Sequence, residues 1–305
     1  MIIPATGSPP TLARAVAAVR AADEPPDELI VVEEPHLAGP ARARNLGVSQ
    51  STADLVAFVD SDVVVAPDAF ARMRRHFRDD ARLTAVFGSY DDQVLTSGLV
   101  ARFRNLLHHH VHTRSAGEAG TFWAGLGAVR RDALERVGGF DEARYRRPSI
   151  EDVELGLRLA DDGARIRLDP EICGAHLKEW TFAQMVRTDF AGRGVPWVHL
   201  LLERREIPRT LNLGWRERAS AVVAVASAAY VVHGRLTRAG VAAAALVPLN
   251  WPFYEVLRRR LGVRDAILSV PLHVSHHLAA AAAVPVGVAT HLTRRRRGRR
   301  TREDV

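Results

Sequence analysis

The sequence predicts an α/β domain with a mixed, mostly parallel sheet flanked by helices, followed by C-terminal membrane-associated helices. Up to about residue 175, short β-branched runs alternate with helical stretches, as such a sheet requires. From about Arg218 onward, alanine-rich apolar stretches replace that alternation. The 305 residues are 47% hydrophobic and 25% charged, which is enough for the core of a large domain and argues against a disordered chain.

The first hundred residues contain a predicted helix and two predicted buried strands. Thr11 to Ala22 is predicted to be a helix because its apolar residues fall on one face. Leu29–Val32 and Leu55–Val59 are predicted to be buried strands because both are continuous apolar runs bounded by acids. Open sheets of this kind bind ligands at the carboxyl ends of their strands, where Glu33 and Asp60 fall. This part of the chain therefore looks like a nucleotide-binding half.

The basic residues are concentrated toward one end of the chain. The formal net charge is +7, and much of the arginine excess lies in Arg258–Arg260 and Arg294–Arg300. Such clusters suit a membrane surface better than nucleic acid, and an aromatic content of 6% offers little surface for base stacking. We therefore expect membrane lipids, and no nucleic acid, among the partners.

Two features favour a cytosolic position for the α/β domain. The single cysteine, Cys173, can form neither an intramolecular disulfide nor a thiolate cluster for zinc, which fits a reducing compartment. Met1–Pro4 is neither a basic n-region nor an apolar run long enough for a signal peptide. We expect a protein of the cell membrane with its α/β domain in the cytosol.

Three apolar stretches are candidates for membrane segments: Ala219–His233, Ala239–Tyr254 and Ala266–Leu292. The first two are shorter than the roughly 20 residues that span a bilayer, so an interfacial or re-entrant position suits them. The third contains four histidines, which are costly in lipid unless they face protein or water. Buried helices of a soluble domain are the alternative. The positive-inside rule assigns both arginine clusters to the cytosol, which conflicts with one crossing between them and leaves the topology open.

Two carboxylates directly follow the strand Leu55–Val59. Asp60 and Asp62 are two residues apart, so in an extended segment their side chains point to the same side. One or two carboxylates, with the remaining ligands from a diphosphate, commonly hold Mg²⁺ or Mn²⁺. Acids often end strands, but the position of this pair after a buried strand favours a metal site.

Glu151 and Asp152 are a second acidic pair, at the start of a predicted helix. Ser149 and Asp152 are spaced as in a capping box, and acids in a first helical turn also stabilise the helix dipole. These structural interpretations suffice in most proteins, so a catalytic interpretation needs the wider context.

Six short motifs occur in order along residues 1 to 200: Ile2-Ile3-Pro4-Ala5, Leu29–Glu33, Gly39–Gly47, Asp60-Ser61-Asp62, Val137–Glu142 and Glu151-Asp152. Each motif is weak by itself, but together they form a specific signal. In this order and spacing they resemble the family 2 glycosyltransferases of the GT-A fold. The resemblance implies a metal-dependent, inverting transfer of a sugar from a nucleotide diphosphate sugar to a hydroxyl or phosphate acceptor.

The resemblance also implies roles for individual residues. The donor-binding residues would be Pro4, Ala5, Glu33, Arg44, Asp60, Ser61 and Asp62. Asp152 would be the general base that deprotonates the acceptor as it attacks the anomeric carbon opposite the departing diphosphate, with Glu151 as the alternative base. A divalent cation, Mg²⁺ or Mn²⁺, would be the cofactor, with Asp62 and Asp60 at the metal.

The segment Thr121–Arg131 resembles the acceptor side of the family. Glycines such as Gly125 would let the sugar approach the backbone, Trp123 could stack against a sugar ring, and Arg130 could bind phosphate. Trp123 is equally well explained as a core residue.

The segment His176–Thr181 resembles the His-x-Lys-x-Trp segment of membrane-linked family members. His176 would complete the metal site, Lys178 would neutralise diphosphate charge, and Trp180 would form a wall beside the acceptor. A structural role for His176 is the alternative.

The C-terminal part resembles, more thinly, bacterial members in which membrane helices follow the catalytic domain. In such proteins an acceptor such as a polyprenyl phosphate, a lipid or a glycan would reach the site at the cytosolic membrane face. One departure is Glu33-Glu34, where the family commonly has an Asp pair, which leaves the base of the donor open. Motifs do not encode the donor sugar.

The expected organisation is a nucleotide-sugar-binding half at 1–110, an acceptor-binding and catalytic half at 111–215, membrane-associated helices at 216–293 and a basic tail at 294–305. The alternatives are a nucleotidyltransferase-like protein and a non-catalytic membrane protein that binds nucleotide sugars. A nucleotidyltransferase should have a Gly-rich basic loop after its first strand, and Ala5–Pro10 contains no basic residue. The acids Asp60, Asp62 and Asp152 argue against a non-catalytic relative.

Overall fold

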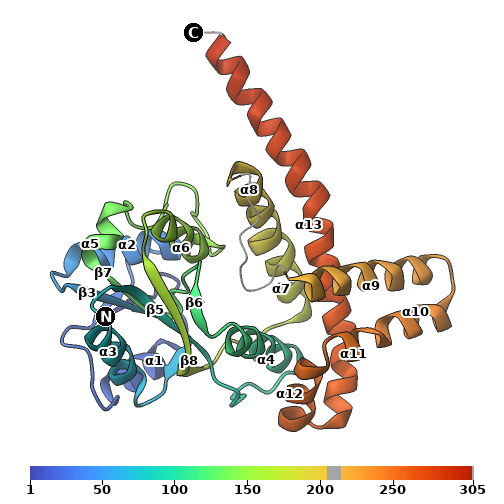
Figure 1. Cartoon of the computed structure of the whole chain (residues 1–305), viewed down its shortest axis with the longest axis horizontal. Helices are drawn as coiled ribbons and strands as arrows, with labels where there is room; N and C mark the ends of the chain where they lie inside the picture. Colours follow the sequence, from blue (N-terminus) through green and yellow to red (C-terminus); the bar gives the residue numbers. More distant parts are fainter. Residues whose placement is uncertain (205–213, 304–305) are drawn as a thin grey trace. The chain divides into compact units, whose positions relative to one another are not determined.

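The computed structural model describes residues 1–204 and 214–303 and has two compact units, Met1–Glu179 and Trp180–Val305 (Figure 1). The first unit contains the sheet, and the second unit is helical in its described part. The expected boundaries near residues 110 and 215 stay predictions. The expected basic tail, 294–305, lies outside the residues whose side chains the structure describes.

The first unit is built on one mixed sheet with the strand order β2-β1-β3-β7-β5-β8-β4, and β6 pairs with β8. The strands are β1 Ile2–Pro4, β2 Ile30–Val32, β3 Leu55–Val59, β4 Val63–Val65, β5 Leu83–Tyr90, β6 Gly117–Ala119, β7 Leu126–Arg130 and β8 Arg165–His176. β1, β2, β3, β5 and β8 run in one direction, whereas β4, β6 and β7 run in the other. The predicted mixed, mostly parallel sheet flanked by helices is confirmed, and it includes both predicted strands.

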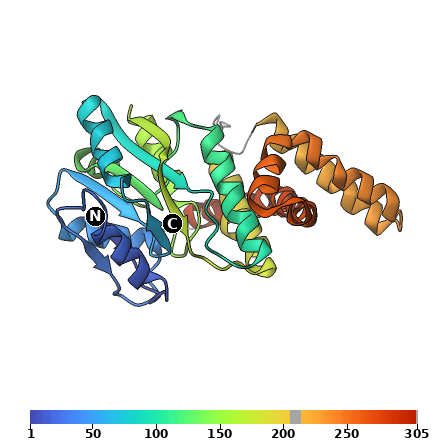
Figure 2. The same ribbon diagram turned by 90° about the horizontal axis from the view of Figure 1, so that it is seen from below.

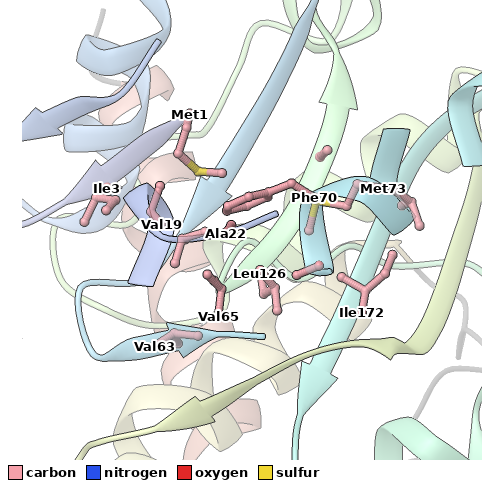
Figure 3. Close-up of a cluster of buried hydrophobic side chains, with 14 of the residues drawn as sticks. Met1, Ile3, Val19, Ala22, Val63, Val65, Phe70, Met73, Leu126 and Ile172 are labelled. Atoms are coloured by element: carbon pink, nitrogen blue, oxygen red, sulfur yellow. The ribbon is translucent and has the colours of Figure 1, made fainter. Parts of the chain in front are cut away.

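One face of the sheet packs against α1 (Leu12–Arg20) and α3 (Ala69–Asp79). Ile3 and Leu126 of the sheet form a buried cluster with Val19 of α1 and Phe70 of α3 (Figure 3). Side chains alternate along a strand, so Ile2 and Pro4, the neighbours of Ile3 in β1, point to the other face. The amphipathic helix predicted from residue 11 onward is therefore confirmed by its packing.

The other face carries α2 (Pro40–Gln50) and α4 (Leu99–Arg114). Ile2 lies so close to Gly47 of α2 that a β-carbon at Gly47 would be 2.4 Å from its side chain. Phe87 of β5 makes edge contacts with His112 of α4 and with Phe122. Figure 1 shows the helices of the first unit lying around the sheet. Their packing holds the strand ends in place.

Helix α6 (Glu151–Asp161) follows the short helix α5 (Arg131–Arg136) and begins at the acidic pair. The predicted capping box of Ser149 and Asp152 is wrong: Ile150 is the N-cap residue, and no side chain caps the helix. The Asp152 carboxylate instead accepts the amide of Val153, in the first turn of the same helix, at 2.8 Å. Gly156 lies where α6 crosses the backbone of residues 121–122.

The second unit consists of α7 Phe182–Arg187, the π-helix η1 Thr188–Gly194, α8 Val195–Arg204, α9 Trp215–Val232, α10 Leu236–Ala244, α11 Leu246–Leu249, α12 Trp251–Leu261 and α13 Val263–Glu303. α9 and α10 lie side by side as a hairpin in both views (Figures 1 and 2). The apolar stretch 239–254 is divided among three helices, with breaks at Ala245 and Asn250, shortly before Pro248 and Pro252, which have no backbone N–H to continue the preceding helix.

Within the described residues, one helical segment, Val263–Thr293, is long and apolar enough to cross a membrane, with a mean hydropathy of 1.4. Only 33% of its most apolar window is buried inside the protein, so most of that window faces outward. The C-terminal apolar helix expected from the sequence is thus present. Its association with a membrane is taken up under the proposed function.

Replacing Gly156 by alanine is expected to destabilise the first unit, because the added methyl group would lie 2.0 Å from the backbone nitrogen of Phe122. Overpacking of this kind costs about 1–3 kcal/mol, so the melting temperature should fall measurably. The control is Gly7→Ala, where no atom lies within 4 Å of the new β-carbon. Equal melting temperatures for the two variants would show that α6 does not pack on this backbone.

Candidate active site

The carboxyl ends of β1, β2 and β3 meet at one edge of the sheet because these strands run parallel. The sequence-predicted residues Pro4, Ala5 and Glu33 lie there: Pro4 ends β1, the amide of Ala5 donates to the carbonyl of Val32 at 2.8 Å, and Glu33 follows β2 with an exposed side chain. The structure therefore brings these three residues to the edge that also carries the residues after β3.

Asp60, Ser61 and Asp62 form the turn between β3 and β4. The amide of Asp60 donates to the carbonyl of Gly125 at 3.0 Å, and the amide of Val63 donates to the carbonyl of Asp60 at 3.0 Å. These bonds hold both carboxylates next to the segment that leads into β7. All three predicted residues of the turn are partly exposed, as a ligand-binding turn requires.

Arg44 of α2 is the buried cation of this edge. Its Nη2 atom lies 2.7 Å from Oδ1 of Asp60, and its Nη1 atom lies 3.0 Å from Oε1 of Glu151. Its guanidinium carbon lies 5.4 Å from the centre of the Phe140 ring, within cation–π range. Burial alone would lower the pKa of Arg44, but the carboxylates of Asp60, Glu151 and Asp152 raise it above its ordinary value. The group stays charged and links β3 to α6.

Asp152 is the second residue of α6. One carboxylate oxygen accepts the amide of Ala124 at 3.2 Å, and the other accepts the amide of Val153 at 2.8 Å. Burial and the nearby charge of Glu151 raise the pKa of Asp152 from 3.8 to about 6, which Arg44 opposes only in part. A carboxylate with a pKa near neutral suits a group that takes up a proton in a reaction.

Glu151 is held differently from Asp152. Oε1 accepts from Arg44, and Oε2 accepts the amide of Ser149 at 2.9 Å. The side chain is buried, so both oxygens are committed to groups of the protein. Asp60 shares the same guanidinium. Burial and the nearby Asp62 carboxylate raise the pKa of Asp60 above its ordinary value, and Arg44 opposes them only in part.

His176 ends β8 and lies opposite Asp62. Its Nε2 atom is 3.4 Å from Oδ2 of Asp62, and the antiparallel pairing of β4 with β8 fixes this neighbourhood. Burial would raise the pKa of Asp62, but the neighbouring His176 lowers it below its ordinary value, with help from Lys178. The predicted metal residues Asp62 and His176 are thus brought together, and Asp60 is bonded to Arg44 instead.

Two donor atoms 3.4 Å apart are close enough to bind one cation, and a carboxylate oxygen with an imidazole nitrogen suits Mn²⁺. Within the described residues, no group of three or more His, Cys, Asp or Glu side chains could hold a metal ion by itself. A cation at Asp62 and His176 therefore needs further ligands from a substrate. A diphosphate provides such oxygens.

The structure places some of the predicted acceptor-binding residues near the site and others away from it. Trp123 is half-buried and makes ring contacts with Tyr90 and His108. Its indole covers Gly125, where a β-carbon would be 2.3 Å from the ring, so this glycine is required by the tryptophan itself. Arg130 pairs with Leu55 at the opposite end of β3 from Asp60.

The Arg130 guanidinium donates to the carbonyls of Leu83 and Ala81 at 2.8 and 3.2 Å, so the structure does not bring it to the site. Lys178 is exposed, and its charge acts on Asp62. Trp180 is the first residue of the second unit, and the site described here is formed by the first unit alone.

Two residues at the site were missed by the sequence analysis. Asn105 of α4 binds His176, and the Tyr90 ring stacks on the His176 ring at 4.1 Å with an interplanar angle of 8°. Neither belongs to a motif, and Asn105 is 71 residues from His176 in the sequence. The sequence carried no local signal for either residue.

Residues 55–190 match the model of the family described as Glycosyl transferase family group 2. The pre-mycofactocin glycosyltransferases of two Mycobacterium tuberculosis strains, CDC 1551 / Oshkosh and ATCC 25618 / H37Rv, are each 34% identical to this chain over 166 residues. The alignment covers 50% of this chain, and the chain spans 34% of the length of these curated relatives.

A solved structure of similar fold is the mannosyltransferase PcManGT from Pyrobaculum calidifontis in complex with GDP-Man and Mn²⁺. The TM-score is 0.55 and the identity 16%, over 93% of this chain and 85% of that chain. At this identity the similarity concerns the fold alone. The family match over residues 55–190, the curated relatives and the shared fold support a glycosyltransferase family 2 domain of GT-A-like fold in this part of the chain.

Proposed function

We propose that the first unit transfers a sugar from a nucleoside diphosphate sugar to an acceptor hydroxyl or phosphate, with inversion at the anomeric carbon. The observation that carries this proposal is the acidic cluster around the buried Arg44 at the carboxyl ends of the strands, in which the partly exposed Asp152 has a pKa of about 6. Around it, Arg44 is bonded to Asp60 and Glu151 rather than to Asp152. One carboxylate is thus kept able to accept a proton.

The donor nucleotide is proposed to lie along the ends of β1, β2 and β3. Pro4, Ala5 and Glu33 would face the base and ribose, and Asp60 would face the ribose while Arg44 holds its carboxylate in place. The solved relative of this fold binds GDP-Man, so GDP-mannose is the first donor to test.

Charge supports a divalent cation as cofactor, Mg²⁺ or Mn²⁺, with Asp62 and His176 as its protein ligands. Asp60, Asp62, Glu151 and Asp152 are all close to this edge, and Arg44 balances only part of their charge. A diphosphate would be repelled by the remaining carboxylates. A bound cation supplies the charge neutralisation that both the binding and the departure of the diphosphate need.

Asp152 is proposed as the general base. The acceptor proton passes to a carboxylate oxygen of Asp152 while the acceptor oxygen forms its bond to the anomeric carbon. The bond from that carbon to the diphosphate oxygen breaks on the opposite face, which gives the inverted product. Glu151 is the weaker candidate because it is buried and ion-paired with Arg44, whereas Asp152 is partly exposed and accepts from backbone amides.

The second unit is proposed to hold the enzyme at the cytosolic face of the cell membrane. On α9 and α10, Val232, Val222 and Val241 are 83%, 70% and 69% exposed. The serines of α9 point inward, and Ser227 donates to the carbonyl of Ala239 at 3.0 Å. Apolar groups outside and polar groups satisfied inside suit a lipid environment. A membrane position favours a lipid-linked acceptor such as a polyprenyl phosphate, with a lipid or another glycan as the alternative.

Binding of the donor can be tested by thermal melting. In detergent-purified protein with Mn²⁺, GDP-mannose or another nucleotide sugar should raise the melting temperature, because a ligand that binds only the folded state stabilises it. A panel of GDP-, UDP- and dTDP-sugars identifies the base and the sugar. The absence of any shift across the panel, with product formation also absent, would contradict the proposed function.

Replacing Asp152 by asparagine should abolish transfer, because an amide cannot accept the proton, while donor binding stays within a few-fold of the original. In the unmodified enzyme the transfer rate should fall as the pH drops below about 6, where Asp152 becomes protonated. The measurements are a pH–rate profile and donor titrations of both proteins. The exposed Asp161→Asn on the same helix is the matched control.

The same substitution should make the protein more stable at pH 7. The folded-state pKa of Asp152, about 6, is above its ordinary 3.8, so the folded state loses stability as the pH rises from 4 through 6. Asparagine avoids this loss but can accept only one of the two backbone amides that Asp152 accepts, so its advantage at pH 7 should be below about 3 kcal/mol and should shrink toward pH 4. Turnover that survives in D152N would assign the base to another residue.

Replacing Asp62 by alanine should remove the dependence of donor binding on Mn²⁺ and weaken donor binding at least ten-fold. Isothermal titration with GDP-mannose, with and without Mn²⁺, measures both effects. The control is Asp54→Ala, an exposed acid just before β3, at the other end of the strand. If D62A kept the Mn²⁺-dependent affinity, the cation would have to bind elsewhere.

A further inference from the structure

A buried amide in the middle of α4 contacts His176 at two points. Oδ1 of Asn105 lies 2.7 Å from Nδ1 of His176, and Nδ2 of Asn105 donates to the backbone carbonyl of His176 at 3.2 Å. Asn105 is 4% exposed and His176 is 5% exposed, so water does not compete for these bonds. The side-chain amide therefore spans both the ring and the backbone of one residue.

The backbone bond fixes the orientation of the amide. A carbonyl oxygen can only accept, so the group of Asn105 that faces it must be the NH₂. The amide oxygen then faces Nδ1 of His176, and this oxygen can only accept as well. Nδ1 must therefore carry a hydrogen. In the neutral ring the lone pair is then on Nε2, the atom that faces Asp62.

We propose that Asn105 is a positioning residue that holds His176 in the Nδ1–H form and so directs the Nε2 lone pair toward Asp62. This inference rests on the proposed function, in which Asp62 and His176 hold the cation. Without the amide oxygen, His176 can take the other form, in which Nε2–H donates to Asp62 and the lone pair faces away from it. Asp62 and His176 would then be hydrogen-bonded to each other, and the Nε2 lone pair would not be available to the cation.

The surroundings of Asn105 support a role beyond packing. The buried side of α4 carries the polar Arg104 and His112 as well as apolar side chains, and asparagine is a poor residue for a helix interior. The Tyr90 ring stacked on His176 fixes the plane of the imidazole but makes no distinction between its two nitrogens. Only a hydrogen-bonding neighbour can choose the tautomer.

The test measures Mn²⁺ affinity directly by the EPR signal of free Mn²⁺, in full-length protein with GDP and then with UDP. Asn105→Leu should weaken Mn²⁺ binding about 10- to 100-fold, the usual effect of losing a residue that orients a metal-binding histidine. Asn105→Asp keeps an oxygen that accepts from Nδ1 but loses the NH₂ that donates to the His176 carbonyl, so its Mn²⁺ affinity should fall less than that of Asn105→Leu. Melting temperatures are measured for all variants.

Asn250→Leu is the matched control, because it removes a half-buried side-chain amide that bonds Ser220 in the second unit. It should lower the melting temperature without changing Mn²⁺ affinity. If the original protein binds Mn²⁺ and N105L binds it equally well, the role of Asn105 is overturned. The same holds if N105D binds Mn²⁺ as weakly as N105L. If the original protein binds no Mn²⁺ in the presence of GDP or of UDP, both the metal site and this inference are overturned. Transfer and donor binding still test the proposed function separately.

Discussion

The site depends on one buried cation, Arg44, shared between two carboxylates that are far apart in the sequence. It binds Asp60 at the end of β3 and Glu151 at the start of α6, 107 residues away from it. A buried ion pair returns little net stability, because both groups lose their hydration. Its value here is geometric: the two bonds bring α6 to the edge of the sheet, and so determine where Asp152 lies. Removing the guanidinium would take from both carboxylates their ion pair and leave the buried Glu151 with the Ser149 amide.

The same constraint separates the roles of four similar carboxylates. Asp60 and Glu151 bind the guanidinium, Asp62 faces His176, and Asp152 binds backbone amides. The environments push the pKa values of Asp62 and Asp152 in opposite directions, downward for Asp62 and upward for Asp152. A carboxylate that stays ionised suits a cation ligand, and one that titrates near neutral pH suits a base. The cost is instability from the buried, partly uncompensated charge of Asp152, a common feature of functional sites.

Much of the fold was predictable because its signals are local. Continuous apolar runs predicted β2 and β3, and amphipathic spacing predicted α1, since burial on one face leaves a pattern within a dozen residues. The capping box was predicted wrongly because the spacing of Ser149 and Asp152 does not reveal which residue ends the turn. The apolar stretch at 239–254 is divided among three helices, since prolines within it override its hydrophobicity. Arg130 lies at the far end of β7 because of the strand register, which the sequence motif around Arg130 does not reveal.

The sequence by itself determined the fold class, the family resemblance and the acidic residues at the strand ends, because each is written in a short stretch of chain. The tertiary structure decided how those acids divide their work. Arg44 binds Glu151 across the sheet edge, and Asn105 reaches His176 from a helix 71 residues earlier. Such contacts depend on the pairing of β4 with β8 and on the packing of α2 and α4 against the sheet, and no local pattern records them. Hydrogen bonds and burial act through space, so the chemistry of each carboxylate was fixed only when the chain folded.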